Sequence, residues 1–151
     1  MKIIMNPSPF DDKLNTCDLG KIYLFLLNEI EGEQITGYKD KDQILYAMAE
    51  KFPNARFVLT LGSDGAVYYD GKEKVFQDIF EVKAVDTTAA GDTFTGYFIA
   101  AVIEDRSVQE ALRMAAKASS IAVSRPGATP SIPAMDEVKG KLGMQDFNKT
   151  E

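Results

Sequence analysis

The feature that most constrains the fold of this 151-residue chain is an unbroken apolar run at residues 22–27, IYLFLL, which a helical pattern follows from Asn28. An unbroken apolar run of this length is typical of a strand that is covered on both faces. Strands of that kind belong to parallel sheets, in which a crossover helix returns the chain to the same edge. We therefore look for strands alternating with helices along the rest of the sequence.

The alternation continues through the first half of the chain. Residues 2–5 predict a strand that stops at two prolines, Asp40 is placed to cap a helix, and residues 57–61 predict the next strand. The segments AVYY and KVFQ, joined by an Asp-Gly turn, predict a hairpin. Residues 80–85 alternate apolar and polar side chains, which predicts a half-exposed strand.

The second half is mainly helical. A turn of small residues at 86–92 leads into a long apolar helix, and Ser107 with Glu110 forms a capping box before an alanine-rich helix. A proline-rich loop at 125–133, a short helix near residues 135–142 and a polar tail follow. The whole pattern predicts a single α/β domain with three layers: a mostly parallel sheet with helices on both faces.

The amino-acid composition excludes several kinds of catalysis and binding. The chain has no His, which excludes Ser-His-Asp and Cys-His catalysis and His-ligated zinc, and Cys17 is its single cysteine. With 17 Lys plus Arg against 23 Asp plus Glu, the net charge of −6 disfavours nucleic-acid binding without excluding a local pocket for a small phosphate. No apolar run is long enough to span a membrane, and the start lacks a signal peptide, so we expect a cytoplasmic protein.

The candidate site lies where the predicted strands end. In α/β folds, ligands bind at the carboxyl ends of the strands, which here carry Asn28, residues 60–63 and residues 86–92. The small residues of the last segment would let backbone N–H groups at the next helix's N-terminus approach an anion. The segment is neither a Walker A loop nor GxGxxG, and the alternative is an ordinary tight connection between strand and helix.

Asp92 places a carboxylate in the first turn of that helix. It could accept a proton from an attacking hydroxyl while the helix N-terminus offsets the charge that builds on a phosphoryl group. The alternative is that Asp92 only complements the helix dipole, a contribution of roughly 0.3 to 1 kcal/mol.

Residues 85–101, VDTTAAGDTFTGYFIAA, closely resemble the C-terminal signature of the ribokinase-like (PfkB) family of carbohydrate kinases. The other motifs of that family occur in the same order: NPSP, an NxxE motif at residues 28–31, TLGSDG, and then SRPGATPSIP after the signature. The resemblance covers residues 2–135. It implies ATP-dependent phosphoryl transfer to a sugar, with Mg²⁺ and K⁺ as cofactors.

The resemblance also implies roles for individual residues. Asp92 would be the general base, and its N–H would form an anion hole with Ala89, Ala90 and Gly91. Asn28 and Glu31 would organise Mg²⁺ around the ATP phosphates; the alternative for Glu31 is a solvated helix carboxylate. The nucleotide would be bound by Thr60, Gly62, Ser63 and Gly65, whose alternative is an ordinary glycine turn. A monovalent-cation loop, acting mostly through carbonyl oxygens, would comprise Asp86, Thr88, Ala122, Arg125, Gly127 and Ser131.

Length separates this chain from the family it resembles. Family members are about twice as long, and their first half supplies the sugar-binding carboxylate, a GGxxxN-type motif and a small β-sheet lid. We therefore expect residues 1–151 to be the C-terminal nucleotide-binding and catalytic portion of such a domain, inactive by itself and prone to form homo-oligomers through its open sheet edge. The alternatives are a non-catalytic nucleotide-binding module, and a family kinase that acts on a nucleoside or a phosphosugar.

Overall fold

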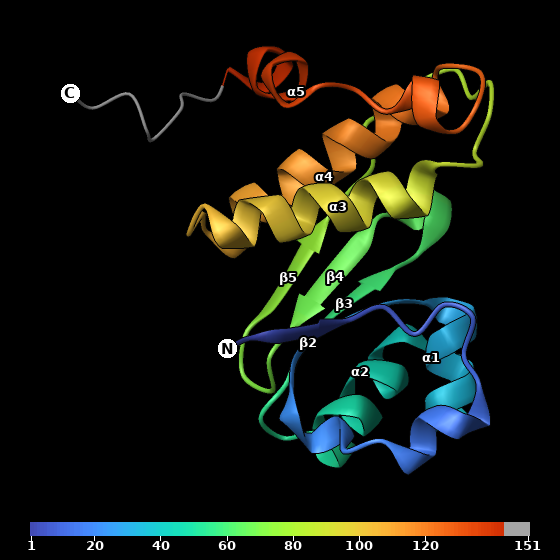
Figure 1. The fold of residues 1–151 in the computed structure, drawn as a ribbon, viewed down its shortest axis with the longest axis vertical. Helices are drawn as coiled ribbons and strands as arrows, with labels where there is room; N and C mark the ends of the chain where they lie inside the picture. The colour runs from blue at the N-terminus through green and yellow to red at the C-terminus, as the bar shows by residue number, and fades with distance from the viewer. Residues whose placement is uncertain (144–151) are drawn as a thin grey trace. The chain divides into compact units, whose positions relative to one another are not determined.

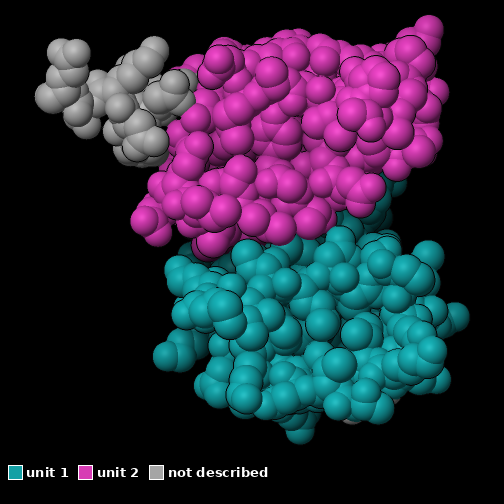
Figure 2. Space-filling view, in the orientation of Figure 1, with its two compact units in different colours: residues 1–78 teal, residues 79–151 magenta. Residues whose placement is uncertain are grey.

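The computed structural model describes residues 1–143, so the predicted polar tail lies outside the described residues. The chain divides into two compact units, residues 1–78 and residues 79–151, which Figure 2 colours separately.

Unit 1 contains a five-stranded sheet in the order β1-β2-β3-β4-β5. Its strands are β1 (Ile3–Met5), β2 (Ile22–Asn28), β3 (Arg56–Thr60), β4 (Ala66–Tyr69) and β5 (Lys74–Gln77). The β1-β2 and β2-β3 pairs are parallel, whereas the β3-β4 and β4-β5 pairs are antiparallel. The predicted "mostly parallel" sheet is therefore mixed, because the hairpin of β4 and β5 adds two antiparallel pairings.

Two helices, α1 (Glu29–Thr36) and α2 (Lys41–Lys51), lie on the same side of the unit 1 strands in Figure 1. As predicted, the side chain of Asp40 caps α2 by accepting hydrogen bonds from the backbone N–H groups of Asp42 and Gln43. The core beneath these helices contains Phe25 and Phe57, whose rings stack with centroids 5.9 Å apart, together with Met48 of α2. Three 3-10 helices complete the described part of unit 1: Asp12–Thr16, Leu19–Lys21 and Gly62–Asp64.

In its described residues, the regular secondary structure of unit 2 is entirely helical. It contains α3 (Ala90–Ile103), α4 (Val108–Val123), a 3-10 turn (Thr129–Ser131) and α5 (Met135–Leu142), with α3 and α4 side by side in Figure 1. The predicted capping box of Ser107 and Glu110 opens α4. Phe98 of α3 and Leu112 and Met114 of α4 are fully buried.

The predicted strand at residues 80–85 is wrong: these residues form no strand, and the side chains of Val82 and Val85 are 43% and 57% exposed. A period-two pattern gives a strand only where another strand pairs with it. Here the backbone N–H groups of Val85 and Asp86 both donate to the carbonyl of Val123 at the end of α4, at 2.8 and 3.1 Å.

Across residues 1–143, no helix combines the length and the apolar character that crossing a lipid bilayer requires.

Candidate functional site

The α1 N-terminus in unit 1 is closed by the two residues of the NxxE motif. The Oδ1 atom of Asn28 accepts a hydrogen bond from the Glu31 N–H, and Oε2 of Glu31 accepts one from the Asn28 N–H, both at 2.9 Å. Glu31 is 5% exposed, so the alternative of a solvated carboxylate is wrong. The pair is a reciprocal capping box at the end of β2.

The predicted nucleotide residues lie at the same edge of the unit 1 sheet. Asn28 and Thr60 are partners in the parallel β2-β3 register, and the Thr60 hydroxyl points to the Leu27 carbonyl at 3.5 Å. Gly62 has a φ of +57° with open space around it, and Ser63 is exposed. The structure thus brings the predicted magnesium and nucleotide residues together.

Gly65 has a separate structural explanation. Its φ is +93°, and a Cβ atom built there would lie 2.2 Å from the Gln77 carbonyl oxygen. Only glycine therefore fits where the 3-10 turn enters β4. The alternative of an ordinary glycine turn accounts for this residue without a ligand.

The α3 N-terminus in unit 2 lacks a side-chain cap. Ala89 is the N-cap residue, and no side chain accepts a capping hydrogen bond from the first turn there. The Ala90 N–H donates to the Thr87 carbonyl at 3.2 Å, but none of the described residues offers a backbone acceptor to the N–H groups of Gly91 and Asp92. Both residues are exposed, and a Cβ atom at Gly91 would meet nothing within 4 Å.

Of the four predicted anion-hole residues, only Gly91 and Asp92 are both exposed and without a backbone acceptor for their N–H groups among the described residues. In contrast, Ala89 is only 6% exposed and the Ala90 amide already has an acceptor. The unpaired N–H groups and the positive end of the helix dipole favour an anion, and the Asp92 carboxylate belongs to the same turn.

The sequence analysis missed two residues around this turn. The Ser119 hydroxyl of α4 donates to the Ala90 carbonyl at 3.1 Å and so holds the first turn of α3 in place. Thr93 is 2% exposed, and its Oγ1 atom is the one fully buried side-chain polar atom of the described chain without a hydrogen-bond partner. Neither feature has a local sequence signal, because each depends on what a distant segment supplies.

The predicted cation-loop residues lie near one another in unit 2. Asp86 accepts hydrogen bonds from the Thr88 N–H at 2.9 Å, from the Thr88 hydroxyl at 2.5 Å and, through its other oxygen, from the Gly127 N–H at 3.1 Å. These bonds, with that from the Thr88 hydroxyl first, hold the pKa of Asp86 below its usual value. The Asp86 side chain therefore connects the turn before α3 to the loop after α4.

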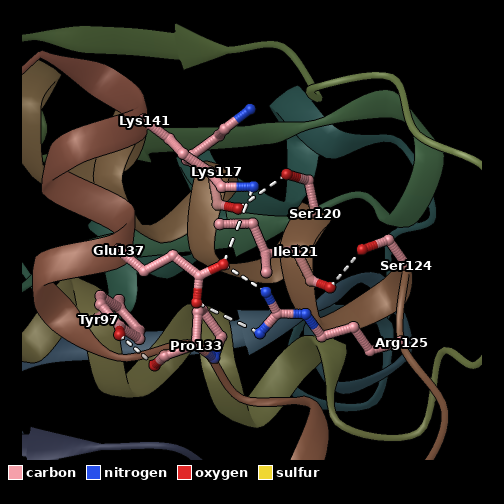
Figure 3. Close-up of polar contacts among 9 residues, drawn as sticks. All are labelled: Tyr97, Lys117, Ser120, Ile121, Ser124, Arg125, Pro133, Glu137 and Lys141. Carbon is pink, nitrogen blue, oxygen red and sulfur yellow. Dashed lines mark hydrogen bonds and ion pairs between the residues drawn. The ribbon is translucent and has the colours of Figure 1, made fainter.

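The remaining predicted members of this loop serve in part as structural contacts. The Ala122 carbonyl accepts the Arg125 N–H at 3.1 Å, and the buried Ser131 hydroxyl donates to the Ala128 carbonyl at 2.6 Å. The Arg125 guanidinium forms an ion pair with Glu137 of α5, which Figure 3 shows. Glu137 is a further residue that the sequence analysis did not single out.

The donor set fits a hydrated magnesium ion better than a protein-enclosed one. Among residues 1–143, no three acidic or cysteine side chains gather into a metal-binding cluster. Mg²⁺ commonly keeps several waters and binds through one or two carboxylates plus substrate phosphates. The single buried carboxylate of Glu31 beside Asn28 is compatible with that mode.

Sequence comparison with known proteins identifies the family of this chain. The sequence model for pfkB family carbohydrate kinases matches residues 1–135. The chain belongs to the PfkB family of carbohydrate kinases.

Individual relatives agree with that assignment. The chain is 36% identical over 145 residues to a ribokinase of Haemophilus influenzae, covering 91% of this chain and 46% of that protein. It is 32% identical over 148 residues to a probable fructokinase-2 of Arabidopsis thaliana, covering 92% and 45%. The chain thus spans about half the length of the curated relatives it matches.

Solved structures confirm the predicted ribokinase-like α/β fold. A ribokinase of Arabidopsis thaliana complexed with ribose and ATP superposes with a TM-score of 0.81 at 32% identity, over 96% of this chain and 48% of that one. A ribokinase of Cryptococcus neoformans in complex with ADP gives a TM-score of 0.84 at 27% identity, over 94% and 52%.

Proposed function

We propose that the chain is the nucleotide-binding and catalytic C-terminal portion of an ATP-dependent sugar kinase of the ribokinase or fructokinase type. The observation that carries the proposal is the first turn of α3, where an uncapped helix N-terminus, an open Gly91 and the exposed Asp92 carboxylate coincide. Family relatives that are ribokinases and a probable fructokinase, and a relative that binds ribose and ATP, support it.

In this proposal the α3 turn does the chemistry of the transfer. The Asp92 carboxylate accepts the proton of the sugar hydroxyl as that oxygen attacks the γ-phosphorus, the bond from the γ-phosphorus to the β,γ-bridging oxygen breaks, and ADP leaves. The N–H groups of Gly91 and Asp92 donate to the γ-phosphoryl oxygens, where negative charge must be stabilised during transfer. Ser119 keeps the turn in position through the Ala90 carbonyl.

Unit 1 would hold the nucleotide. Asn28 and Glu31 keep each other's orientation fixed and would hold Mg²⁺ and its waters, which when bound offset the charge of the ATP phosphates. Thr60, Gly62 and Ser63 lie at the same sheet edge and would contact the nucleotide. In unit 2, carbonyl oxygens of the 125–131 loop would hold K⁺, a cation whose field orders the adjoining turn.

The test measures MgATP binding and phosphoryl transfer to a sugar in separate experiments. Titrating the 151-residue chain with MgATP in a calorimeter should give saturable binding, and parallel assays on a panel of sugars should give no phosphorylation. Transfer is expected to be absent because positioning the acceptor hydroxyl is worth several kcal/mol, and we propose that the acceptor-binding residues belong to the other half of the domain. Absence of MgATP binding would contradict the proposal, and robust turnover would contradict the missing acceptor site.

A non-catalytic nucleotide-binding module of the same family is the second candidate. The two candidates separate when the chain is combined with an acceptor-binding half: the kinase gains transfer activity that depends on Asp92, and the module does not. A panel that includes nucleosides and phosphosugars identifies the acceptor class in the same experiment. The homo-oligomer and the cytoplasmic location stay predictions, the first of which is tested by sedimentation.

A further inference from the structure

An ion pair in unit 2 connects the start of the 125–131 loop to helix α5. Arg125 lies at the start of the loop, and Glu137 lies on α5, after its end. The guanidinium reaches both carboxylate oxygens: Nη1 is 3.3 Å from Oε2, and Nη2 contacts Oε1 (Figure 3). A two-point contact between a guanidinium and a carboxylate fixes orientation as well as distance.

The rest of the loop has few other attachments. Residues 126–130 are exposed, and their hydrogen bond to the turn before α3 runs from the Gly127 N–H to Asp86. At the far end, Ser131 is 1% exposed, and the Tyr97 hydroxyl of α3 donates to the Pro133 carbonyl at 2.6 Å. The exit of the loop is therefore held by burial and by α3, and its entry by the ion pair together with the hydrogen bond from the Arg125 N–H to the Ala122 carbonyl.

We propose that Glu137 is a positioning residue for the 125–131 loop. Its ion pair with Arg125 holds the entry of the loop so that the Gly127 N–H reaches Asp86, and Asp86 begins the turn that carries Asp92. In this way α5 sets the position of the loop carbonyl oxygens. The consequence for K⁺ rests on the proposed function, whereas the consequence for the Gly127–Asp86 bond does not.

The first measurement is amide hydrogen exchange of Gly127 by NMR under native conditions. Glu137→Gln keeps the size of the side chain and removes its charge, and it should speed exchange at Gly127 about threefold to tenfold without a similar change in α3 or α4. The double variant Arg125→Glu/Glu137→Arg should restore protection. Asp136→Asn, the adjacent exposed acid on α5, is the matched control and should leave Gly127 unchanged.

Two outcomes of that measurement would overturn the positioning role. In one, Glu137→Gln leaves Gly127 exchange at the wild-type rate. In the other, exchange rises equally throughout unit 2, which would make Glu137 a general stabilising residue rather than a positioning one.

The second measurement follows the cation. The thermal midpoint of the 151-residue chain is recorded against KCl, with tetramethylammonium chloride keeping ionic strength constant. The K⁺ concentration that gives half of the stabilisation should rise about tenfold in Glu137→Gln and return toward wild type in the double variant. An equal half-saturating concentration in wild type and variant would contradict the link between Glu137 and the cation. Lack of any K⁺ response in the wild-type chain would reject the cation part of the proposed function, and the Gly127 result alone would then decide the positioning role.

Discussion

The N-termini of α1 and α3 differ in how their first amide groups are satisfied. At α1, Asn28 and Glu31 exchange two hydrogen bonds of 2.9 Å, and Glu31 is buried. At α3, the N-cap position is occupied by Ala89, whose methyl group cannot accept a hydrogen bond, and the exposed Gly91 and Asp92 lie in the first turn after it. At the first terminus a side chain accepts the Glu31 N–H, whereas at the second no side chain accepts from the first turn and the N–H groups of Gly91 and Asp92 have no backbone acceptor among the described residues.

Under the proposed function, the α1 terminus stabilises the fold and the α3 terminus receives a ligand. A capped terminus stabilises the fold whether or not a ligand is present, but an uncapped one gains its missing bonds only when an acceptor arrives. Absence of a cap does not define a site, because α5 also begins without one, after Ala134. At α3 the open Gly91, the acid in the first turn and the family signature add to it.

The largest expected effect is on turnover at the uncapped terminus. Asp92→Asn, made in a chain that includes the acceptor-binding half, should lower kcat by about 10²- to 10⁴-fold and change KM for ATP little, because it removes a proton acceptor and keeps size and polarity. Steady-state kinetics measure both constants. Asp136→Asn, which removes one of the two first-turn acids of α5, the other described α-helix without a side-chain cap, is the control. If Asp92→Asn kept more than half of the wild-type kcat, Asp92 would not be the general base, and only its interaction with the helix dipole would remain.

The next effect is on stability at the capped terminus. Asn28→Ala removes the side chain that accepts the Glu31 N–H and should lower the free energy of unfolding by about 0.5–2 kcal/mol. Asp92→Asn should cost at most the dipole contribution, roughly 0.3–1 kcal/mol. Urea denaturation compares the two, with Ser107→Ala at the second capping box as a positive control. A larger loss at Asp92 than at Asn28 would contradict the proposed roles of the two termini.

Thr93, also in the first turns of α3, tests whether a buried hydroxyl without a hydrogen-bond partner lowers stability. Thr93→Val keeps the side-chain shape and removes a buried hydroxyl that has no partner, so it should leave stability unchanged or raise it by about 1 kcal/mol. Denaturation of the ligand-free chain measures this effect. A clear loss of stability would mean that the hydroxyl forms a hydrogen bond in solution.

The smallest effect is a dependence on pH at Asp86. Its pKa is lowered in the folded chain, so its stabilising contribution is present above the ordinary value of 3.8 and is lost as pH falls through the folded value. The difference in thermal midpoint between wild type and Asp86→Asn should therefore be constant at neutral pH and shrink below about pH 4. Thr88→Val removes the hydrogen bond that lowers the pKa most, so in that background the difference should be smaller and its loss should be complete at a higher pH. A constant difference down to pH 2 would contradict this account.

The sequence predicted those parts of the molecule that depend on local patterns. The caps at Asp40 and Ser107 require only a side chain next to its own helix, and both are confirmed. The β2 strand was predicted because its apolar run is unbroken. The strand at residues 80–85 was wrong because alternation does not report whether a pairing strand is available.

Long-range contacts of the candidate site could not be predicted in the same way. The hydrogen bond from Ser119 to the Ala90 carbonyl joins residues 29 positions apart in the sequence, and the bond from Gly127 to Asp86 joins residues 41 positions apart. Such contacts depend on how α3, α4 and their loops pack, which no local pattern encodes. The burial of Glu31 likewise follows from the packing around α1, whereas its capping partner could be predicted from the NxxE spacing.

The measurement that tests the central claim most directly compares Gly91→Val with Gly96→Val by NMR titration of MgATP into the 151-residue chain. Both glycines are exposed on α3, and a Cβ atom at either meets nothing within 4 Å, so the two variants should have similar stability. We predict that MgATP shifts the Gly91 and Asp92 amide resonances of the wild-type chain and of Gly96→Val with the same affinity, and that Gly91→Val binds about tenfold or more weakly. Equal affinity in both variants, or MgATP binding that leaves these two amides unshifted, would contradict the claim that the α3 N-terminus receives the phosphate.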